Sequence, residues 1–409
     1  MVAYFALSDL VESRWRQYAA RTVEIVDGLS LGETARLASA FSTARLLDFG
    51  LMASLSSRAL ECLRAEQGAG AASATAADAR RLAMAFGRAR AFDSDLMEAL
   101  VPIISERVED FRPRELARVA DAYARAAVQS PDLFALAAEA LPPYLYDLEP
   151  GDLAALCRGF SEAAVYSSEL TDALCEEVVK RLKSFGPLEC LVFLEGLAQL
   201  SEGLPEEMRR DDAETVAAVA GQLARSMQSL AAGDIVRVFS ALVQLDHYDQ
   251  FLVHARLCEA LAQKLSQGQL RGPPAFARLA ELLHCLSLLP AQSHKSAELA
   301  LTTAALLREC GPPRGGRPEP RALALVASAL AELGQQDQDL LEMLGGAVLP
   351  RPSAGLPSDP RHGAGPSELL ALSSDDELQD LQRAFRACRS EALAGACAAI
   401  GAELARRSE

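Results

Sequence analysis

Apolar side chains recur along this chain in the rhythm of an amphipathic helix, and the rhythm restarts every 37 to 47 residues. Within each restart the spacing is i, i+3, i+4, which is the pattern of a helix that buries one face. Each apolar run ends on one large residue, called the anchor here. The eight anchors are Phe41, Phe86, Tyr123, Phe160, Leu197, Leu242, Leu283 and Leu330. The pattern therefore predicts eight similar helices.

Each predicted helix opens with residues that suit a helix N-terminus. Ser30 with Glu33, and Thr75 with Asp78, have the spacing of a capping box, in which side chain and backbone bond each other reciprocally. A proline, whose missing N–H does no harm in the first turn, opens five others: Pro113, Pro150, Pro187, Pro273 and Pro320. An acid, favourable at the positive end of the helix dipole, precedes six anchors by eight residues: Glu33, Asp78, Glu115, Asp152, Glu189 and Asp234.

A second helix is predicted after each anchor. A leucine recurs ten residues later, at Leu51, Leu96, Leu133, Leu170, Leu252 and Leu340. Three of these have another leucine four residues on, which places both on one helix face. A helix–turn–helix unit of this size cannot bury both faces alone and must stack on its neighbours. We therefore expect an all-α fold without a sheet, a right-handed α-solenoid of about eight repeats of 37–47 residues.

Changes in composition divide the chain into five expected segments. Residues 1–29 form an N-terminal helical segment, 30–310 hold repeats one to seven, and 311–349 hold a linker and repeat eight. Residues 350–368 are rich in Pro, Gly and Ser, which is typical of a flexible loop. Residues 369–409 contain two further helical patterns and are expected to cap the stack.

Composition and charge narrow the function classes. The net charge of −16 argues against wholesale nucleic-acid binding by a basic surface. The nine cysteines include no C-x-x-C pair, which indicates reduced thiols in a non-secretory compartment. No apolar run is long enough for a membrane span, so no membrane insertion is expected.

The sequence offers no constellation for catalysis. His247 and His254 lack an acid or cysteine at metal-ligand spacing, and His284 lies in an apolar helix pattern. The glycines do not form a phosphate-binding motif. We expect no enzyme activity, no catalytic or metal-binding residues, no cofactor and no small-molecule substrate.

The repeat resembles a known family. The 37-residue interval, the L-A-x-A-F/Y helix and the D/E–L opening, over about 30 to 350, resemble heptatricopeptide repeats, relatives of the octotricopeptide and RAP-domain proteins of mitochondria and plastids. No strand-rich RAP-like segment closes the chain, so no nuclease-like activity is carried over. The resemblance implies organellar RNA metabolism, including helical proteins that pack on ribosomal RNA, in a mitochondrion or alternatively a plastid.

Arginines recur on the helix face opposite the anchors. Five residues before the anchor stand Arg36, Arg81, Arg118, Arg237 and Arg278, and Arg88, Arg125 and Arg158 fall on the same side. A stacked array would turn them into a stripe suited to phosphates. The predicted RNA contacts are Arg36, Arg81, Arg88, Arg118, Arg125 and Arg158. Alternatively the stripe is a solvated face whose arginines pair with acids of their own helix, as Glu33, Asp78, Glu115, Asp234 and Asp121 would allow.

Three functions remain open from the sequence. The first is a non-catalytic scaffold of an organellar ribonucleoprotein, most specifically a mitochondrial ribosome component that contacts rRNA phosphates and neighbouring ribosomal proteins. The second is a protein–protein scaffold, such as an accessory subunit of a respiratory or ATP-synthase complex, without RNA contact. The third is a factor that recognises one RNA base per repeat, and it ranks lowest. Such a factor needs suitable polar side chains at matched positions, but the positions two residues before the anchors include Met84, Asp121 and Glu195.

Protein partners are expected at the later repeats. These repeats carry Val192, Glu195, Gln199 and Gln244 on the face that bears arginines earlier in the chain. An acidic cluster is a candidate site for a basic protein partner, with a solvated loop as the alternative interpretation; it consists of Glu206, Glu207, Asp211 and Asp212.

Overall fold

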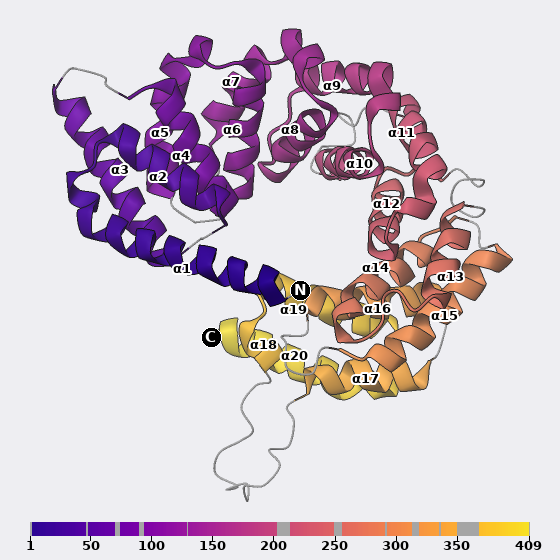
Figure 1. The fold of residues 1–409 in the computed structure, drawn as a ribbon. Helices are drawn as coiled ribbons and strands as arrows, with labels where there is room; N and C mark the ends of the chain where they lie inside the picture. Colours follow the sequence, from indigo (N-terminus) through magenta and orange to yellow (C-terminus); the bar gives the residue numbers. More distant parts are fainter. Residues whose placement is uncertain are drawn as a thin grey trace, which may run out of the picture. The chain divides into compact units, whose positions relative to one another are not determined.

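The computed structural model describes eleven stretches of the chain. They are residues 2–45, 48–69, 74–89, 94–128, 130–202, 213–248, 256–290, 293–312, 319–334, 337–349 and 368–408. These residues form α-helices and short 3-10 turns, and no strand occurs among them (Figure 1). The expected all-α fold without a sheet is confirmed for this part of the chain.

Helices alternate in the predicted order. The predicted first helices are α2 (Leu31–Thr43), α4 (Ala76–Ala89), α6 (Pro113–Arg125), α8 (Pro150–Glu162), α10 (Pro187–Glu202), α12 (Ala232–Gln244), α14 (Phe276–Ser287) and α16 (Pro320–Glu332). The second helices are α3 (Phe49–Ala69), α5 (Ser94–Glu106), α7 (Pro131–Ala140), α9 (Ser168–Arg181), α11 (Ala213–Ser226), α13 (Cys258–Ser266), α15 (His294–Cys310) and α17 (Gln338–Val348). The remaining helices are α1 (Val2–Ile25), α18 (Glu368–Leu372), α19 (Asp375–Ala387) and α20 (Ala394–Ser408).

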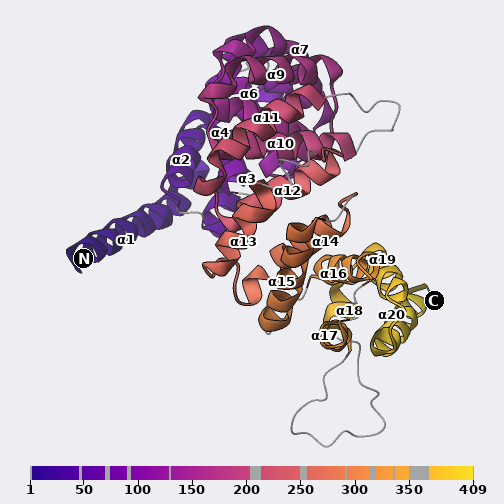
Figure 2. The ribbon, with the colours of Figure 1, turned by 90° about the vertical axis from the view of Figure 1, so that its right-hand side faces the viewer.

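The chain forms two compact units, residues 1–219 and 220–409, which divide within α11. In the first unit α2, α4, α6, α8 and α10 pack on one another in chain order, and α3, α5, α7 and α9 follow the same order beside them. In the second unit the successions are α12, α14, α16, α19 and α13, α15, α17, α20 (Figure 2). Within each unit, then, every first helix contacts the next first helix.

The anchors form the core of these contacts. All eight are buried, with at most 3% of their surface exposed. The leucines ten residues later are buried wherever the structure describes them, at Leu51, Leu96, Leu133, Leu170 and Leu340. Leu252 lies outside the described residues. Tyr123 is a polar exception among the anchors, and its hydroxyl donates to the Met97 carbonyl oxygen at 2.7 Å.

The helix starts match the sequence with two differences. Ser30 and Glu33 form the reciprocal capping box, whereas Thr75 accepts from the Asp78 amide but donates its own hydroxyl to the Asp78 carboxylate. Pro113, Pro150, Pro187 and Pro320 begin their helices as predicted. Pro273 instead begins a short 3-10 turn, η8 (Pro273–Ala275), which leads into α14.

The C-terminal helices, expected only as a cap, repeat the pattern of a first and second helix. Ser374 and Glu377 form a capping box at the start of α19, and Phe385, eight residues after Glu377, is 1% exposed. Because α19 packs on α16 and α20 packs on α17, they extend both successions by a further pair. The expected flexible loop at 350–368 lies outside the described residues, except for Glu368 at the start of α18.

No helix in the described stretches is both long enough and apolar enough to cross a membrane.

Candidate nucleic-acid interface

The arginine column lies on the face of the first helices that points away from the buried anchors. Arg36, Arg118 and Arg278 are exposed, and Arg81 and Arg237 are half-buried. Arg88 and Arg125, two residues after their anchors, are exposed as well. The placement inferred from the helical wheel is therefore confirmed.

The acid partners of these arginines were predicted only in part. Asp78–Arg81, Asp234–Arg237 and Asp121–Arg125 form the expected pairs within one helix, at 3.1, 3.1 and 2.8 Å. The expected Glu33–Arg36 and Glu115–Arg118 pairs do not form, because both glutamates have other partners.

Glu33 and Glu115 bind instead at helix starts and on a neighbouring helix. Glu33 accepts from the Ser30 amide at 2.9 Å, and this backbone bond, followed by the Ser30 hydroxyl, lowers the pKa of Glu33. Glu115 accepts from the Arg112 amide and pairs with Arg80 of the preceding first helix. Arg36 has no ion-pair partner among the described residues.

Two aspartates each hold two arginines and connect the consecutive first helices α6 and α8. Asp121 on α6 binds Arg125 of its own helix and Arg158 of α8. Asp152 on α8 binds Arg114 at 2.7 Å and Arg118 at 3.0 Å, both from α6. The carboxylates are the buried partners: the side chains of Asp121 and Asp152 are 14% and 10% exposed, against 43% for Arg125 and 44% for Arg118.

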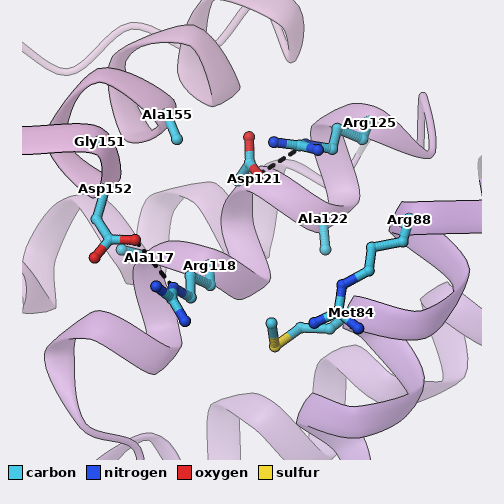
Figure 3. A pocket seen from close by; sticks show the side chains of 11 residues that line it. Met84, Arg88, Ala117, Arg118, Asp121, Ala122, Arg125, Gly151, Asp152 and Ala155 are labelled. Atoms are coloured by element: carbon cyan, nitrogen blue, oxygen red, sulfur yellow. Dashed lines mark hydrogen bonds and ion pairs between the residues drawn. The ribbon is translucent and has the colours of Figure 1, made fainter. Parts of the chain in front are cut away.

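These groups surround an open hollow of about 280 Å³ over α4, α6 and α8 (Figure 3). Arg88 enters the space from α4, and Arg118 enters it from α6. The hollow exists because much of its lining is small; the small residues are Gly87, Ala117, Ala122, Gly151 and Ala155.

The guanidinium groups keep unused donors at this hollow. Arg118 donates from Nε to Asp152 Oδ1 at 3.0 Å, and the nitrogen of Arg125 nearest to Asp121 is also Nε, at 2.8 Å. The described residues offer no hydrogen bond to a terminal nitrogen of either arginine. Arg88 uses one terminal nitrogen on the Thr43 hydroxyl at 3.2 Å. A guanidinium with two free terminal N–H groups can bind a phosphate or carboxylate bidentately.

The structure thus groups the six predicted RNA contacts unevenly. Arg88, Arg118 and Arg125 line the hollow, and Arg158 adjoins it through Asp121. Arg36 and Arg81 do not line it. No signal in the sequence could have singled out the glycines of the lining, because a glycine marks a hollow only once the neighbouring helices are placed.

The residues expected to meet protein partners differ in exposure. Val192 and Glu195 are half-buried, whereas Gln199 and Gln244 are exposed. The Ser161 hydroxyl donates to Gln199 Oε1 at 3.1 Å. The acidic cluster of Glu206, Glu207, Asp211 and Asp212 lies outside the described residues.

The second unit carries a different hollow, of about 530 Å³, on α14, α16 and α19. Its charged lining is Arg321, Arg383, Glu377 and Asp380, and its walls include Ala324, Leu325, Ala384 and Ala387. His284 also lines it, and burial, followed by the charge of Arg321, lowers the pKa of this imidazole. The Arg383–Asp380 pair at 3.0 Å balances two of the charges. This hollow was not predicted from the sequence, because residues 369–409 were expected to form only a cap.

Metal-ligating side chains and cysteines were compared with the sequence expectations over the described stretches. They contain no cluster of three or more His, Cys, Asp or Glu side chains placed to hold a metal ion. The nine cysteines are free thiols, and burial raises the pKa of Cys190 and of Cys258 to about 11, which keeps these thiols protonated at neutral pH. His247 is half-buried, and His254 lies outside the described residues.

No protein-family model and no curated protein matches this chain, so its functional assignment rests on its own residues and geometry.

Proposed function

We propose that this protein is a non-catalytic helical-repeat scaffold within an organellar ribonucleoprotein, with a mitochondrial ribosome as the specific assembly. The architecture proposed is a right-handed α-solenoid of heptatricopeptide-like repeats. Support comes from the ordered packing of first helix on first helix within each unit, and from the repeated opening and anchor residues. Solenoids of this kind present extended binding surfaces rather than a single deep pocket.

One observation carries the RNA contact: three arginines from two consecutive first helices converge on one open hollow with unused terminal nitrogens. Planar guanidinium groups match the geometry of phosphate oxygens. Because aromatic side chains are absent from the described lining of the hollow, base stacking is not expected there. The contact proposed is therefore with RNA phosphates and shape, not with base sequence.

A second candidate function is a protein–protein scaffold without RNA, such as an accessory subunit of a mitochondrial membrane complex. It is favoured by the ion pairs of Arg81, Arg118, Arg125 and Arg158, which reduce the positive charge of the stripe. The hollow on α14, α16 and α19, with its apolar walls and balanced charges, suits a protein partner better than a phosphate.

Salt dependence of RNA binding by the purified chain separates the two candidates. A fluorescent oligouridylate serves as the probe, and the variant Arg88→Gln/Arg118→Gln/Arg125→Gln is compared with the unaltered protein. Removing one arginine–phosphate interaction should reduce the slope of log affinity against log salt by about 0.7. We expect weaker binding and a shallower slope, with unchanged helicity by circular dichroism.

The control is Arg237→Gln/Arg278→Gln, which removes two arginines at the repeat position of Arg118 in the second unit, where they pair with Asp234 and Glu281. This control should bind RNA nearly as the unaltered protein does. If the unaltered chain binds no RNA, or if both sets of substitutions change the slope equally, the hollow is not a phosphate site and the protein-scaffold function takes its place.

A further inference from the structure

We propose that Asp121 and Asp152 are positioning residues that strengthen anion binding at the hollow, although both carry negative charge. The proposal rests on the proposed function, since it concerns how the same hollow would hold a phosphate. It goes beyond that function because it states that the two aspartates strengthen anion binding. From their charge alone, they would be expected to repel the anion.

The two aspartates and four arginines form an ion-pair network between α6 and α8. Asp121 has Arg158 beside Oδ1 and Arg125 beside Oδ2. Asp152 accepts a hydrogen bond from Arg118 on Oδ1 and has Arg114 beside Oδ2 as an ion pair without a hydrogen bond. Each carboxylate therefore joins α6 to α8 and is shared by two guanidinium groups. A carboxylate has enough acceptor sites for two such partners.

The aspartates in this network are more deeply buried than the arginines that line the hollow. Both aspartates are less than 15% exposed, whereas Arg118 and Arg125 are more than 40% exposed. The negative charges thus lie behind the arginines, seen from the solvent. An anion that enters the hollow meets guanidinium nitrogens as well as the two aspartates, which also line it, and each carboxylate already has arginines beside it at 3.0 Å or less.

The contacts with aspartate involve one nitrogen of Arg118 and one nitrogen of Arg125. Arg118 donates from Nε to Asp152, and Nε is also the nitrogen of Arg125 nearest to Asp121, so the described contacts of both groups leave their terminal nitrogens for a ligand. Fixing Nε also limits rotation of the long side chain before any ligand arrives. Binding then costs less conformational entropy than it would for a freely rotating arginine.

Charge and positioning predict opposite results for the variant Asp121→Asn. Charge alone predicts tighter anion binding, because one negative charge has gone. Positioning predicts weaker binding, because an asparagine oxygen can hold only one of the two arginines while its NH₂ group repels the other. We expect the dissociation constant for oligouridylate to rise about two- to tenfold, the cost of ordering one released side chain on binding. Asp152→Asn should act in the same direction.

Asp121 is the better test position. It lies in the second half of α6, where the helix dipole does not favour an acid, so its removal is not expected to weaken the helix. Asp152 lies in the first turn of α8, where its loss also weakens the helix start. Glu139→Gln is the charge-matched control, because Glu139 is an exposed residue near the C-terminal end of α7 that does not line the hollow.

A double-variant cycle supplies a readout that a merely structural role would not move. If Asp121 acts through Arg125, Asp121→Asn should add less to the loss in Arg125→Gln than it causes alone. Thermal unfolding of each variant shows whether the fold is retained. Asp121→Glu, which keeps the carboxylate, should bind more tightly than Asp121→Asn.

The outcomes separate this inference from the proposed function. Weaker binding by Asp121→Asn, with binding by Glu139→Gln unchanged or tighter, supports the positioning role. Binding by Asp121→Asn that equals or exceeds that of the unaltered protein overturns the positioning role, while loss of binding in Arg118→Gln still upholds the phosphate site. If neither Arg118→Gln nor Asp121→Asn changes the affinity or its salt dependence, the phosphate site and the positioning role both fail.

Discussion

Single glycines determine how closely the first helices approach one another. A Cβ atom built on Gly87 of α4 would lie 2.6 Å from the Ala122 carbonyl oxygen and 2.7 Å from Ala122 Cα. On Gly196 of α10 it would lie 2.7 Å from Cys157 Sγ. Backbone atoms cannot move aside as a flexible side chain does, so the contact at Gly87 admits no larger residue without separating α4 from α6.

Gly87→Ala should therefore destabilise the protein, although alanine favours a helix over glycine by about 1 kcal/mol. We expect a net loss of about 1–3 kcal/mol, the usual cost of overpacking a close contact. The measurement is chemical denaturation followed by circular dichroism. Gly221→Ala in α11, where a Cβ meets nothing within 4 Å, is the control and should be neutral or stabilising. A stabilising Gly87→Ala would contradict the close packing of α4 on α6.

Residue patterns predicted burial better than they predicted partners. The anchors and the arginine column lie where a helical wheel places them, because burial depends on periodicity within one helix. Glu115 and Arg118 pair with residues of other helices, Arg80 and Asp152, because charged groups on consecutive first helices come as close as groups within one helix. Such pairs depend on the separation and register of two helices, which the spacing along one helix does not contain.

At the scale of the elements, the start of α19 is fixed by its capping box. Ser374 Oγ accepts from the Glu377 amide, and the Glu377 carboxylate accepts from the Ser374 amide at 2.8 Å. Ser374→Ala should lower the free energy of unfolding by about 1 kcal/mol, as for other N-cap serines. The control is Ser54→Ala, since the Ser54 hydroxyl bonds the Gly50 carbonyl within its own helix. Equal stability of both variants in a urea titration would mean that α19 does not depend on this cap.

The last helix should respond to acid in a defined pH window. Hydrogen bonds from Arg406 and then Arg407 lower the pKa of Glu403 from 4.5 to about 2. Because the carboxylate is favoured in the folded state, its contribution is complete above pH 4.5 and is lost as the pH falls through 2. Arg407 also binds Asp375 and the Ser373 carbonyl, so the loss loosens α20 from α18 and α19.

The measurement is the difference in unfolding midpoint between the unaltered protein and Glu403→Gln. This difference should be largest at neutral pH and should shrink as the pH falls from 4.5 towards 2. A difference that stays constant over this range would show that Glu403 is not held ionised by Arg406 and Arg407.

Element prediction failed where the interval between repeats was interrupted. Phe385 and Glu377 have the spacing of every earlier anchor and acid, yet Phe385 follows Leu330 by 55 residues because 350–368 intervenes. The capping box and the anchor of α19 therefore identify it as a first helix. The distance of its anchor from the preceding anchor does not. The prediction that Pro273 begins an α-helix was wrong for a local reason. Pro274 follows it, and the two prolines lie in a 3-10 turn before α14 begins.

At the scale of the whole molecule, the net charge and the repeat geometry indicate that RNA would contact only a small part of the surface. A net charge of −16 disfavours RNA over most of the surface, so an RNA contact must come from a place where arginines are held together. The hollow on α4, α6 and α8 is such a place in the first unit. The fold class followed from periodicity, whereas the hollow required the helices to be placed, because the small residues and shared aspartates that create it belong to three helices.

The most direct test of the scaffold function is sedimentation of the tagged chain from organelle lysate, before and after RNase treatment. The unaltered chain should migrate with ribosomal particles and shift to slower fractions after RNase, and Arg88→Gln/Arg118→Gln/Arg125→Gln should shift without RNase. If the chain instead migrates with a membrane complex, and RNase does not change its migration, the ribonucleoprotein assignment is contradicted. That result would support the protein–protein scaffold.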